Sequence, residues 1–309
     1  DEAAVACVFL LDNYSDSEPI NIAGGTFHCW RRSGHGVVDM NRAIAESCDI
    51  YFYVMGIRVG IQPIADMARR FGLGERFLGL PVPYQYYGTV PDPAWKRRRY
   101  NEPWEAYDTV NATIGQGYLL ANPLQLAVMC ARLATGKKLM PHLVMDQQAP
   151  PPESLGFPED HIVRVRNAMS DVVNGPGTAG RARLPLDNVK LAGKTGTAQV
   201  VSLSRGDGKN TIWKYRDHGL FIAFAPFDNP RYACATVIEH GGGSGAAYPV
   251  ARDVLLYLYD RQKAMDSLLA LEKQWGGDIE QRMARDLALF RARQSGEAQS
   301  DTKDGEQTT

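Results

Sequence analysis

The hydrophobic positions of this 309-residue chain repeat with two different periods. Through the first half and again at the end they recur at the spacing of one helix face, whereas between them β-branched and aromatic runs bounded by turn residues predict strands that follow one another as an antiparallel meander. This order of elements predicts an α/β (α+β) protein, an antiparallel sheet flanked by helices with an all-helical lobe. The predicted helices span 39–58, 62–71, 122–135, 161–173, 248–263 and 264–293, and the predicted strands span 189–201, 218–226 and 231–239.

Three segments lack a clear period. Residues 1–38 are rich in glycine and polar residues, which predicts irregular structure. Residues 78–112 are dense in Pro, Tyr and Trp, which predicts a long ordered surface loop. Residues 294–309 are too polar to bury a core and are predicted to be disordered. We therefore expect a main domain over 1–263, a helical C-terminal extension over 264–293 and a polar tail over 294–309.

Composition narrows the function classes. With 44% hydrophobic residues and a formal net charge of −1, the chain is typical of a globular protein and not of one that binds nucleic acid. The basic run Lys96–Arg99 is isolated, and such runs are usually solvated faces. No stretch approaches the roughly 20 apolar residues of a membrane span. The five cysteines fit no tidy disulfide framework, and their odd number leaves at least one unpaired within the chain.

The chemistry begins with a Lys-Thr-Gly triplet, Lys194 to Gly196, on the first predicted strand. Such a triplet forms one wall of penicillin-recognising active sites, although alone it also fits a hairpin with an exposed lysine. A Ser-x-Asp element, Ser47 and Asp49, lies within the predicted helix 39–58. Glycines at 193 and 196 would let a substrate backbone approach the strand closely.

Together with further motifs in order, these two elements resemble the class B penicillin-binding proteins, most closely the elongation-specific type. The resemblance runs from about residue 27 to residue 260, and so many ordered matches are far more specific than any one of them. The matching segments are Phe27–Trp30, Gly34–Gly36, Ser47–Asp49, Phe71–Gly74, Ile114–Tyr118, Asn122–Leu126, Gly193–Thr197 and Glu239–Gly243.

The resemblance implies a serine-type D,D-transpeptidase that cross-links peptidoglycan stem peptides and is acylated by β-lactams. It implies that Lys194 holds substrate and tunes protons, and that the hydroxyls of Thr195 and Thr197 bind a terminal carboxylate beside Gly196. The Thr197 N–H would help to form an oxyanion hole. Ser47 would relay a proton, and Asp49 would hold that network in place.

The nucleophile of the family is not found at a plausible place in this chain. A Ser-x-x-Lys spacing occurs only at Ser300 and Lys303, inside the polar tail, where we attribute it to chance. In the family this motif precedes Ser-x-Asp by more residues than stand ahead of Ser47. We therefore expect a transpeptidase truncated before its nucleophile, which is inactive on its own.

The resemblance also implies a periplasmic domain tethered to the inner membrane by an upstream anchor, with a glycan polymerase of the elongation machinery (the SEDS type) as a partner. Two alternatives remain open at this point. A D,D-carboxypeptidase or a serine β-lactamase shares the Lys-Thr-Gly strand. A catalytically dead scaffold domain would bind zinc and a membrane partner but would never be acylated by penicillin.

A second set of residues has the chemistry of a metal site. Asp16, Cys29, His35 and Cys48 supply one carboxylate, two thiolates and one imidazole, which suits tetrahedral Zn²⁺ and no hard cation. Four protein ligands would close the site, so its role would be structural, pinning residues 1–38 to the helix of Ser47. The resemblance favours this hypothesis, because some members carry zinc on such a pattern.

Other interpretations of the same residues stay open. Cys29 and Cys48 could form a disulfide, and His35 could cap a turn between two glycines. His28 could replace one ligand, and Asp12 lies close to Asp16, which is the weakest member of the set.

Overall fold

The structure is a computed structural model, and it describes residues 14–16, 18–77, 80, 86–143, 151–201 and 212–294. The chain forms two compact units, residues 1–252 and 253–309. Within the described residues, no helix has the length and apolar character needed to cross a membrane. Ser300, Lys303 and Asp12 lie outside the described residues.

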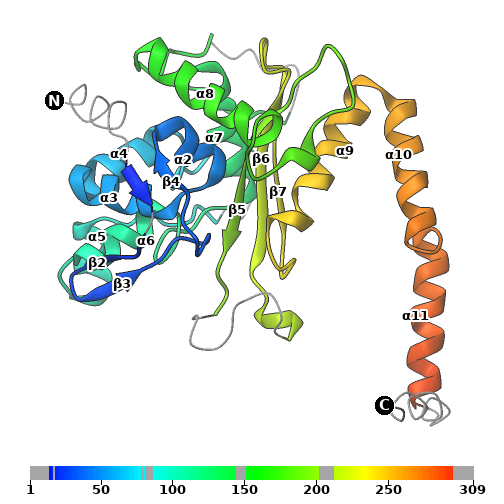
Figure 1. The fold of residues 1–309 in the computed structure, drawn as a ribbon. Coiled ribbons are helices and arrows are strands. Elements are labelled where there is room, and N and C mark those ends of the chain that lie inside the picture. Colours follow the sequence, from blue (N-terminus) through cyan, green and yellow to red (C-terminus); the bar gives the residue numbers. More distant parts are fainter. Residues whose placement is uncertain are drawn as a thin grey trace. The chain divides into compact units, whose positions relative to one another are not determined.

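The sheet of the first unit is the antiparallel meander that the sequence predicts (Figure 1). Its strands are β5 (Ala192–Ala198), β6 (His218–Ala225) and β7 (Tyr232–Ile238), in the order β5-β6-β7. Lys194 stands opposite Ile222, and Thr197 stands opposite Gly219. Within the described residues β5 pairs only with β6 in this sheet, so its other edge has no strand partner.

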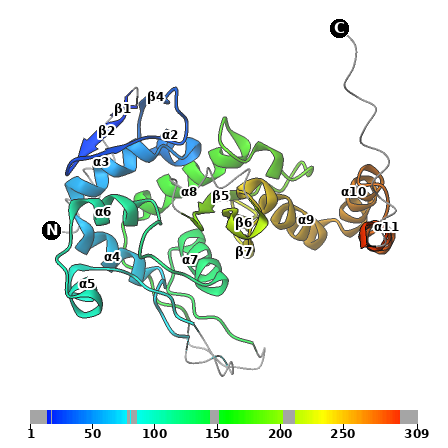
Figure 2. The same cartoon turned by 90° about the horizontal axis from the view of Figure 1, so that it is seen from below.

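Two long helices cover the sheet and connect it to the lobe that carries Ser47. Helix α7 (Pro123–Thr135) packs on β7, and α8 (Glu159–Asn174) lies between β5 and α2 (Met40–Glu46), as Figure 2 shows. Side chains join the layers, because Asn41 of α2 donates to Asp171 of α8 and Asn174 of α8 donates to the Leu191 carbonyl. The core between α7, α8 and the sheet contains Cys130, Ala134, Met169, Ala192 and Phe224.

The all-helical lobe consists of α2 together with four further helices. The prediction of a loop over 78–112 is wrong in part, because it contains α5 (Pro93–Tyr100) and all but the last residue of α6 (Ala106–Thr113). Its basic run is not a uniformly solvated face either, since Lys96 is only 4% exposed and its ammonium lies 2.6 Å from Asp108. The further helices are α3 (Asp49–Val59), α4 (Ile61–Arg70), α5 (Pro93–Tyr100) and α6 (Ala106–Thr113).

The predicted helix 39–58 is also two helices. Asp39 caps α2 by accepting the Arg42 N–H, and α2 ends at Ser47, whose backbone is left-handed with φ 57°. Helix α3 then begins at Asp49. Hydrophobic periodicity continues across this break because both helices bury apolar residues in one core, so the period alone does not reveal it.

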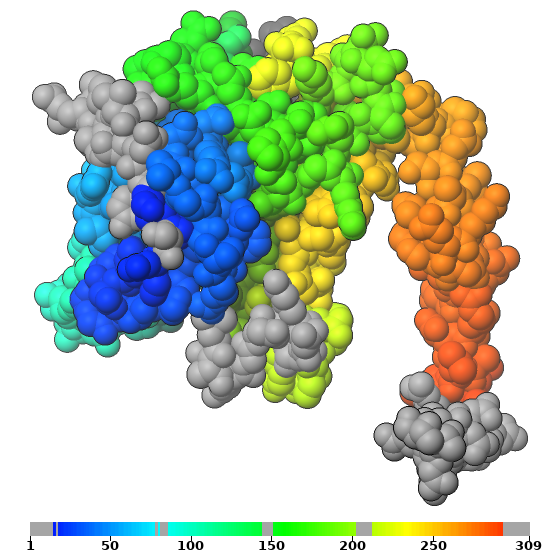
Figure 3. All heavy atoms as spheres, viewed as in Figure 1, coloured from blue at the N-terminus to red at the C-terminus, as the bar shows by residue number. Residues whose placement is uncertain are grey.

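The segment ahead of α2 contains four short strands in two separate pairs. In one pair β1 (Tyr14–Asp16) runs antiparallel to β4 (Gly36–Val38), and in the other β2 (Ile20–Ile22) runs antiparallel to β3 (Gly25–Phe27). The expectation of irregular structure is therefore wrong in part, because these strands lie within 1–38, while residues 28–35 between them are irregular. In Figure 3 the blue surface of this segment and α2 lies directly beside the green surface of α8.

The last three helices bring the chain into its second unit. Helix α9 (Tyr248–Tyr259) ends earlier than predicted, because Asp260 caps a new helix by accepting the Lys263 N–H. That helix, α10 (Arg261–Gln274), is separated from α11 (Ile279–Gln294) by two glycines with positive φ. Apolar side chains of both helices are exposed, among them Leu269, Trp275, Met283 and Phe290.

Candidate active site

Ser47 lies at the break between two helices, and this break sets its direction. A left-handed backbone costs a non-glycine residue roughly 1–2 kcal/mol, and strain of this kind clusters at functional sites. The Ser47 N–H still bonds to the Ile44 carbonyl at 3.3 Å, so the turn is well anchored. The serine hydroxyl consequently leaves the helix surface and faces β5.

Lys194 meets that hydroxyl. Its ammonium donates to Ser47 Oγ and, at 3.1 Å, to the Thr195 carbonyl. The two residues are 147 positions apart in the sequence, so the fold brings together the two elements that the sequence singled out. A cation next to a hydroxyl is an arrangement that can move a proton or hold an anion.

Burial changes the proton affinity of this site. Burial lowers the pKa of Lys194 from 10.5 to about 8, and the nearby Asp49 carboxylate opposes that shift only in part. Burial likewise raises the pKa of Asp49, against the Trp30 N–H and Lys194, both of which favour the carboxylate. In mildly alkaline solution, near this pKa, about half of the Lys194 side chains are therefore protonated and the other half are neutral.

We expect the Lys194 ammonium to titrate with a midpoint near 8, because it is largely desolvated. Side-chain nitrogen NMR across pH 6–11 measures this midpoint, and ordinary lysines titrate near about 10.4. Since the folded pKa is the lower one, the unfolded chain binds more protons between about 8 and 10.5, and this lysine makes stability rise with pH there. A midpoint near 10.4 would contradict the burial.

Trp30 holds the Ser47 turn from the other side. Its indole N–H donates to the Ser47 carbonyl at 2.9 Å and to the Glu46 carbonyl at 3.2 Å. Its backbone N–H donates to the Asp49 carboxylate at 2.8 Å. Trp30 thus satisfies two carbonyls at the end of α2, which would otherwise lack partners, and also binds the side chain of the first residue of α3.

We expect Trp30→Phe to destabilise the protein by about 1 kcal/mol, because an aromatic ring remains and the indole N–H donor is lost. In a unit of this size the melting temperature should fall by roughly 2–4 °C. Trp213→Phe is the matched control, since Trp213 is also exposed but does not contact the turn. Equal shifts in the two variants would show that the indole donor contributes nothing.

The strand hydroxyls have different partners. Thr195 Oγ1 lies 2.7 Å from Thr178 Oγ1, and the Thr178 N–H donates to the Ala45 carbonyl at 3.2 Å. Thr178 therefore connects α2 to β5 beside the serine. Thr197 is exposed. Gly193 has a packing explanation and not a substrate one, because a Cβ there would lie 2.5 Å from the Phe221 ring.

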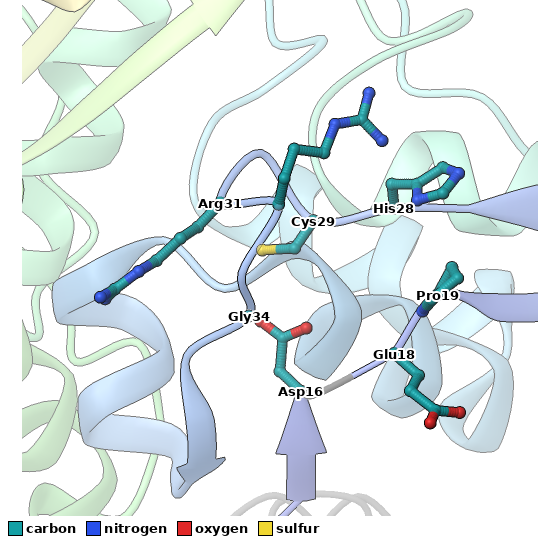
Figure 4. A pocket seen from close by; sticks show the side chains of 8 residues that line it. Asp16, Glu18, Pro19, His28, Cys29, Arg31 and Gly34 are labelled. Carbon is teal, nitrogen blue, oxygen red and sulfur yellow. The ribbon is translucent and has the colours of Figure 1, made fainter.

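Asp16, Cys29, His35 and Cys48 form a buried group that could hold a metal, with their ligand atoms within 4.8 Å of one another. Asp16 Oδ2 lies 2.7 Å from His35 Nδ1 and 3.2 Å from Cys48 Sγ, and Cys29 Sγ lies 3.5 Å from His35 Nδ1. Figure 4 shows the Asp16 carboxylate and the Cys29 thiol beside a small pocket of about 30 Å³.

The donor set and its spacing fit a tetrahedral ion. Bond lengths of about 2.0–2.3 Å put tetrahedral ligands roughly 3.3–3.8 Å apart, close to the spacing found here. Both cysteines are free thiols, so no disulfide joins them, and His28 is exposed outside the group. A hydrogen bond from Cys48 lowers the pKa of Cys29 to about 7, and the same bond raises that of Cys48.

Comparison with known proteins now decides the family. The model of the penicillin-binding protein transpeptidase domain matches residues 8–256. The chain belongs to this transpeptidase family. That match confirms the family resemblance seen in the sequence and the fold class, and the relatives described next confirm the PBP2 or MrdA type.

Relatives of this transpeptidase domain are similar over most of its length. The peptidoglycan D,D-transpeptidase MrdA of Acinetobacter baumannii is 38% identical over 253 residues, which are 77% of this chain and 37% of that protein. MrdA of Escherichia coli K12 is 31% identical over 241 residues, 73% of this chain and 38% of that protein. The chain thus spans less than two fifths of these curated relatives.

Solved structures agree with the fold of this transpeptidase domain. Pseudomonas aeruginosa PBP2 in complex with WCK 5153 has a TM-score of 0.68 and 29% identity, covering 87% of this chain and 59% of that one. Helicobacter pylori PBP2 in its complex with MreC has a TM-score of 0.69 and 30% identity, covering 79% and 45%.

The fold brings Ser47, Asp49 and Lys194 of the transpeptidase domain together, and it brings the four candidate ligands together separately. Three neighbours of the site were not predicted from the sequence: Trp30, Thr178 and Gln116. Trp30 and Gln116 stand in segments that carry the family resemblance, which was the available signal. No sequence signal pointed to Thr178, because it stands in a turn of small residues outside the matching segments.

Proposed function

We propose that this chain is the C-terminal portion of a peptidoglycan D,D-transpeptidase whose nucleophilic serine and its lysine are supplied by an upstream Ser-x-x-Lys segment. The observation that carries the proposal is the contact of Lys194 with Ser47 across α2 and β5. The Ser47 hydroxyl at the end of α2 and the Lys194 ammonium on β5 would form a site that binds a peptide carbonyl next to the Thr197 N–H.

In the proposed reaction the upstream serine oxygen attacks the carbonyl between two terminal D-alanines, and its proton passes to the upstream lysine. The Thr197 N–H stabilises the oxyanion. The C–N bond then breaks, and Ser47 relays the proton to the leaving D-alanine amine. The amine of a neighbouring stem attacks the acyl-serine, losing a proton to the same network, and the serine is regenerated.

The proposed substrate contacts come from residues of β5. Lys194 and the exposed Thr197 hydroxyl would bind the terminal carboxylate. The Thr195 hydroxyl already has a partner in Thr178, so it would either share that bond or orient Thr178 toward the ligand. β-Lactams, which also carry a carboxylate beside a reactive carbonyl, would acylate the same serine.

We also propose that the ion held by Asp16, Cys29, His35 and Cys48 is Zn²⁺ with a structural role. All four residues are buried, two of the ligands are soft thiols, and four protein ligands leave no open position. Cys29 precedes Trp30 and Cys48 follows Ser47, so zinc would fix the turn that orients the serine.

The parent protein would act at the periplasmic face of the bacterial inner membrane, held by an anchor upstream of this chain. A SEDS-type glycan polymerase of the elongation machinery would be its partner. The solved structure of a peptidoglycan synthase complex that coordinates polymerisation and crosslinking is similar to this chain, with a TM-score of 0.65 and 28% identity, which supports that proposal.

Penicillin labelling tests the function. The full-length protein should be acylated by a fluorescent penicillin at one serine, which peptide mapping should place in a Ser-x-x-Lys motif upstream of residue 1. With pentapeptide stems it should release D-alanine and form dimers. Release of D-alanine without dimer formation would indicate a carboxypeptidase. Rapid turnover of penicillin would indicate a β-lactamase, and zinc binding without acylation would indicate a scaffold domain. Residues 1–309 alone should not be labelled.

A further inference from the structure

Thr178 joins the end of α2 to the Thr195 hydroxyl of β5. The two threonine side-chain oxygens lie 2.7 Å apart, and both residues are half-buried. The Thr178 N–H donates to the carbonyl of Ala45, two residues ahead of Ser47, at 3.2 Å. Thr178 stands in the turn after α8, outside any helix or strand. A turn residue therefore contacts both of the elements that form the proposed site.

The turn that carries Thr178 is fixed by its packing against α8. A Cβ at Gly177 would lie 2.3 Å from the Cα of Val172, so a larger residue would not fit without moving the helix backbone. Ala179 is buried, and its N–H donates to the Val172 carbonyl at 2.9 Å. Backbone packing thus places the Thr178 side chain, and the turn does not depend on the Thr178 hydroxyl.

The direction of the bond between the two threonines decides what Thr195 can offer a ligand. A hydroxyl has one hydrogen to donate, and an ionised carboxylate only accepts. If the Thr195 hydroxyl donated to Thr178, only its lone pairs would face a carboxylate. If Thr178 donates instead, the Thr195 hydrogen is free for the ligand. The two bonds then form a chain in which each strengthens the other.

We propose, on the basis of the proposed function, that Thr178 is a positioning residue that donates to Thr195 and so directs the Thr195 hydrogen toward the carboxylate of the acyl donor. Thr178 acts through Thr195 and does not touch the ligand. Thr195 and Thr197 are two positions apart on β5, so their side chains project from one face of the strand and can share one carboxylate. Stem peptides ending in D-alanine and penicillins both carry that carboxylate.

The test measures acylation of the full-length protein by two probes. One is a fluorescent penicillin, and the other is its methyl ester, which keeps the reactive ring and has no negative charge. Thr178→Val keeps the side-chain shape and loses the hydroxyl, so it should slow acylation by the acid about fivefold, the effect of one ordinary hydrogen bond. Acylation by the ester should stay within about twofold of wild type. Thr178→Ser, which keeps the hydroxyl, should react with the acid at close to the wild-type rate.

Saturation kinetics with the acid alone provide a second readout. Because Thr178 acts on carboxylate binding, Thr178→Val should raise the half-saturating concentration about fivefold and leave the limiting rate within about twofold. A lower limiting rate at an unchanged half-saturating concentration would overturn the positioning role. Equal slowing of acid and ester would also overturn it, since that result would mean that Thr178 only braces α2 against β5. An unchanged acid rate would do the same.

The controls separate this inference from the proposed function. Thr135→Val removes a hydroxyl that donates to the Ala131 carbonyl within α7, and it should change neither rate. Circular dichroism melting confirms the folding of each variant, and Thr178→Ala replaces Thr178→Val if the valine variant does not fold. If the wild-type protein does not react with the acid, the proposed function fails. If wild type reacts and Thr178→Val reacts equally well, only the role of Thr178 fails.

Discussion

Lys194→Ala in the full-length protein is expected to slow acylation by penicillin about 10³-fold, in the middle of the range for a lost proton-transfer group. The substitution removes both the partner of Ser47 and the cation that would hold a ligand carboxylate. It also leaves Asp49 without its nearest positive charge, which favours the protonated carboxyl. Stopped-flow labelling with fluorescent penicillin gives the rate constant.

Lys190→Ala is the matched control, because Lys190 is an exposed lysine just before the same strand. It should react at the wild-type rate. Lys194→Arg adds a second comparison, since it keeps the charge and loses the compact ammonium. If Lys194→Ala folds and still reacts within about threefold of wild type, Lys194 is not part of the acylation site.

Cys48→Ala is expected to abolish metal binding and to lower the melting temperature by roughly 10 °C. Removing one member of a buried group leaves the others without a partner, at a cost of about 3–5 kcal/mol, and each kcal/mol corresponds to roughly 2–4 °C. Zinc content by mass spectrometry of purified protein should fall from about one per chain to background, and a strong chelator should lower the wild-type melting temperature similarly.

Cys234→Ala provides the comparison, because this free cysteine stands on β7, outside the candidate ligand group. It should keep its zinc and lose little stability. If wild-type protein purified with added zinc contains none, and chelator leaves its melting temperature unchanged, the zinc proposal is wrong.

The parts of the fold that were predicted are those in which one local signal dominates. Strands β6 and β7 were found because their apolar runs ended at clear turns such as Asp228–Pro230, and α7 was found because Asn122 and Pro123 marked its start. Helices α5 and α6 were missed because their many aromatic and proline residues resemble a loop. Tertiary contacts stabilise these two helices, and among them is the buried ion pair of Lys96 and Asp108.

The candidate site shows the same division. The motifs identified Ser47 and Lys194, but not that α2 ends at the serine, because no glycine marks that left-handed position. Nor did the sequence indicate that the Thr195 hydroxyl has a partner in Thr178 or that Gln116 binds the edge of β5. Such contacts join segments far apart in the chain, and no local pattern encodes them.

At residue 47 the left-handed backbone favours glycine for thermal stability, whereas the contact with Lys194 requires the hydroxyl of serine. Glycine would adopt φ 57° without the steric cost that serine bears, and the neighbouring carbonyls would keep their bonds to Trp30. The only thing that serine adds there is a hydroxyl within reach of Lys194. A library of this domain screened for heat resistance alone would therefore enrich glycine at 47 and lose the contact between its two walls.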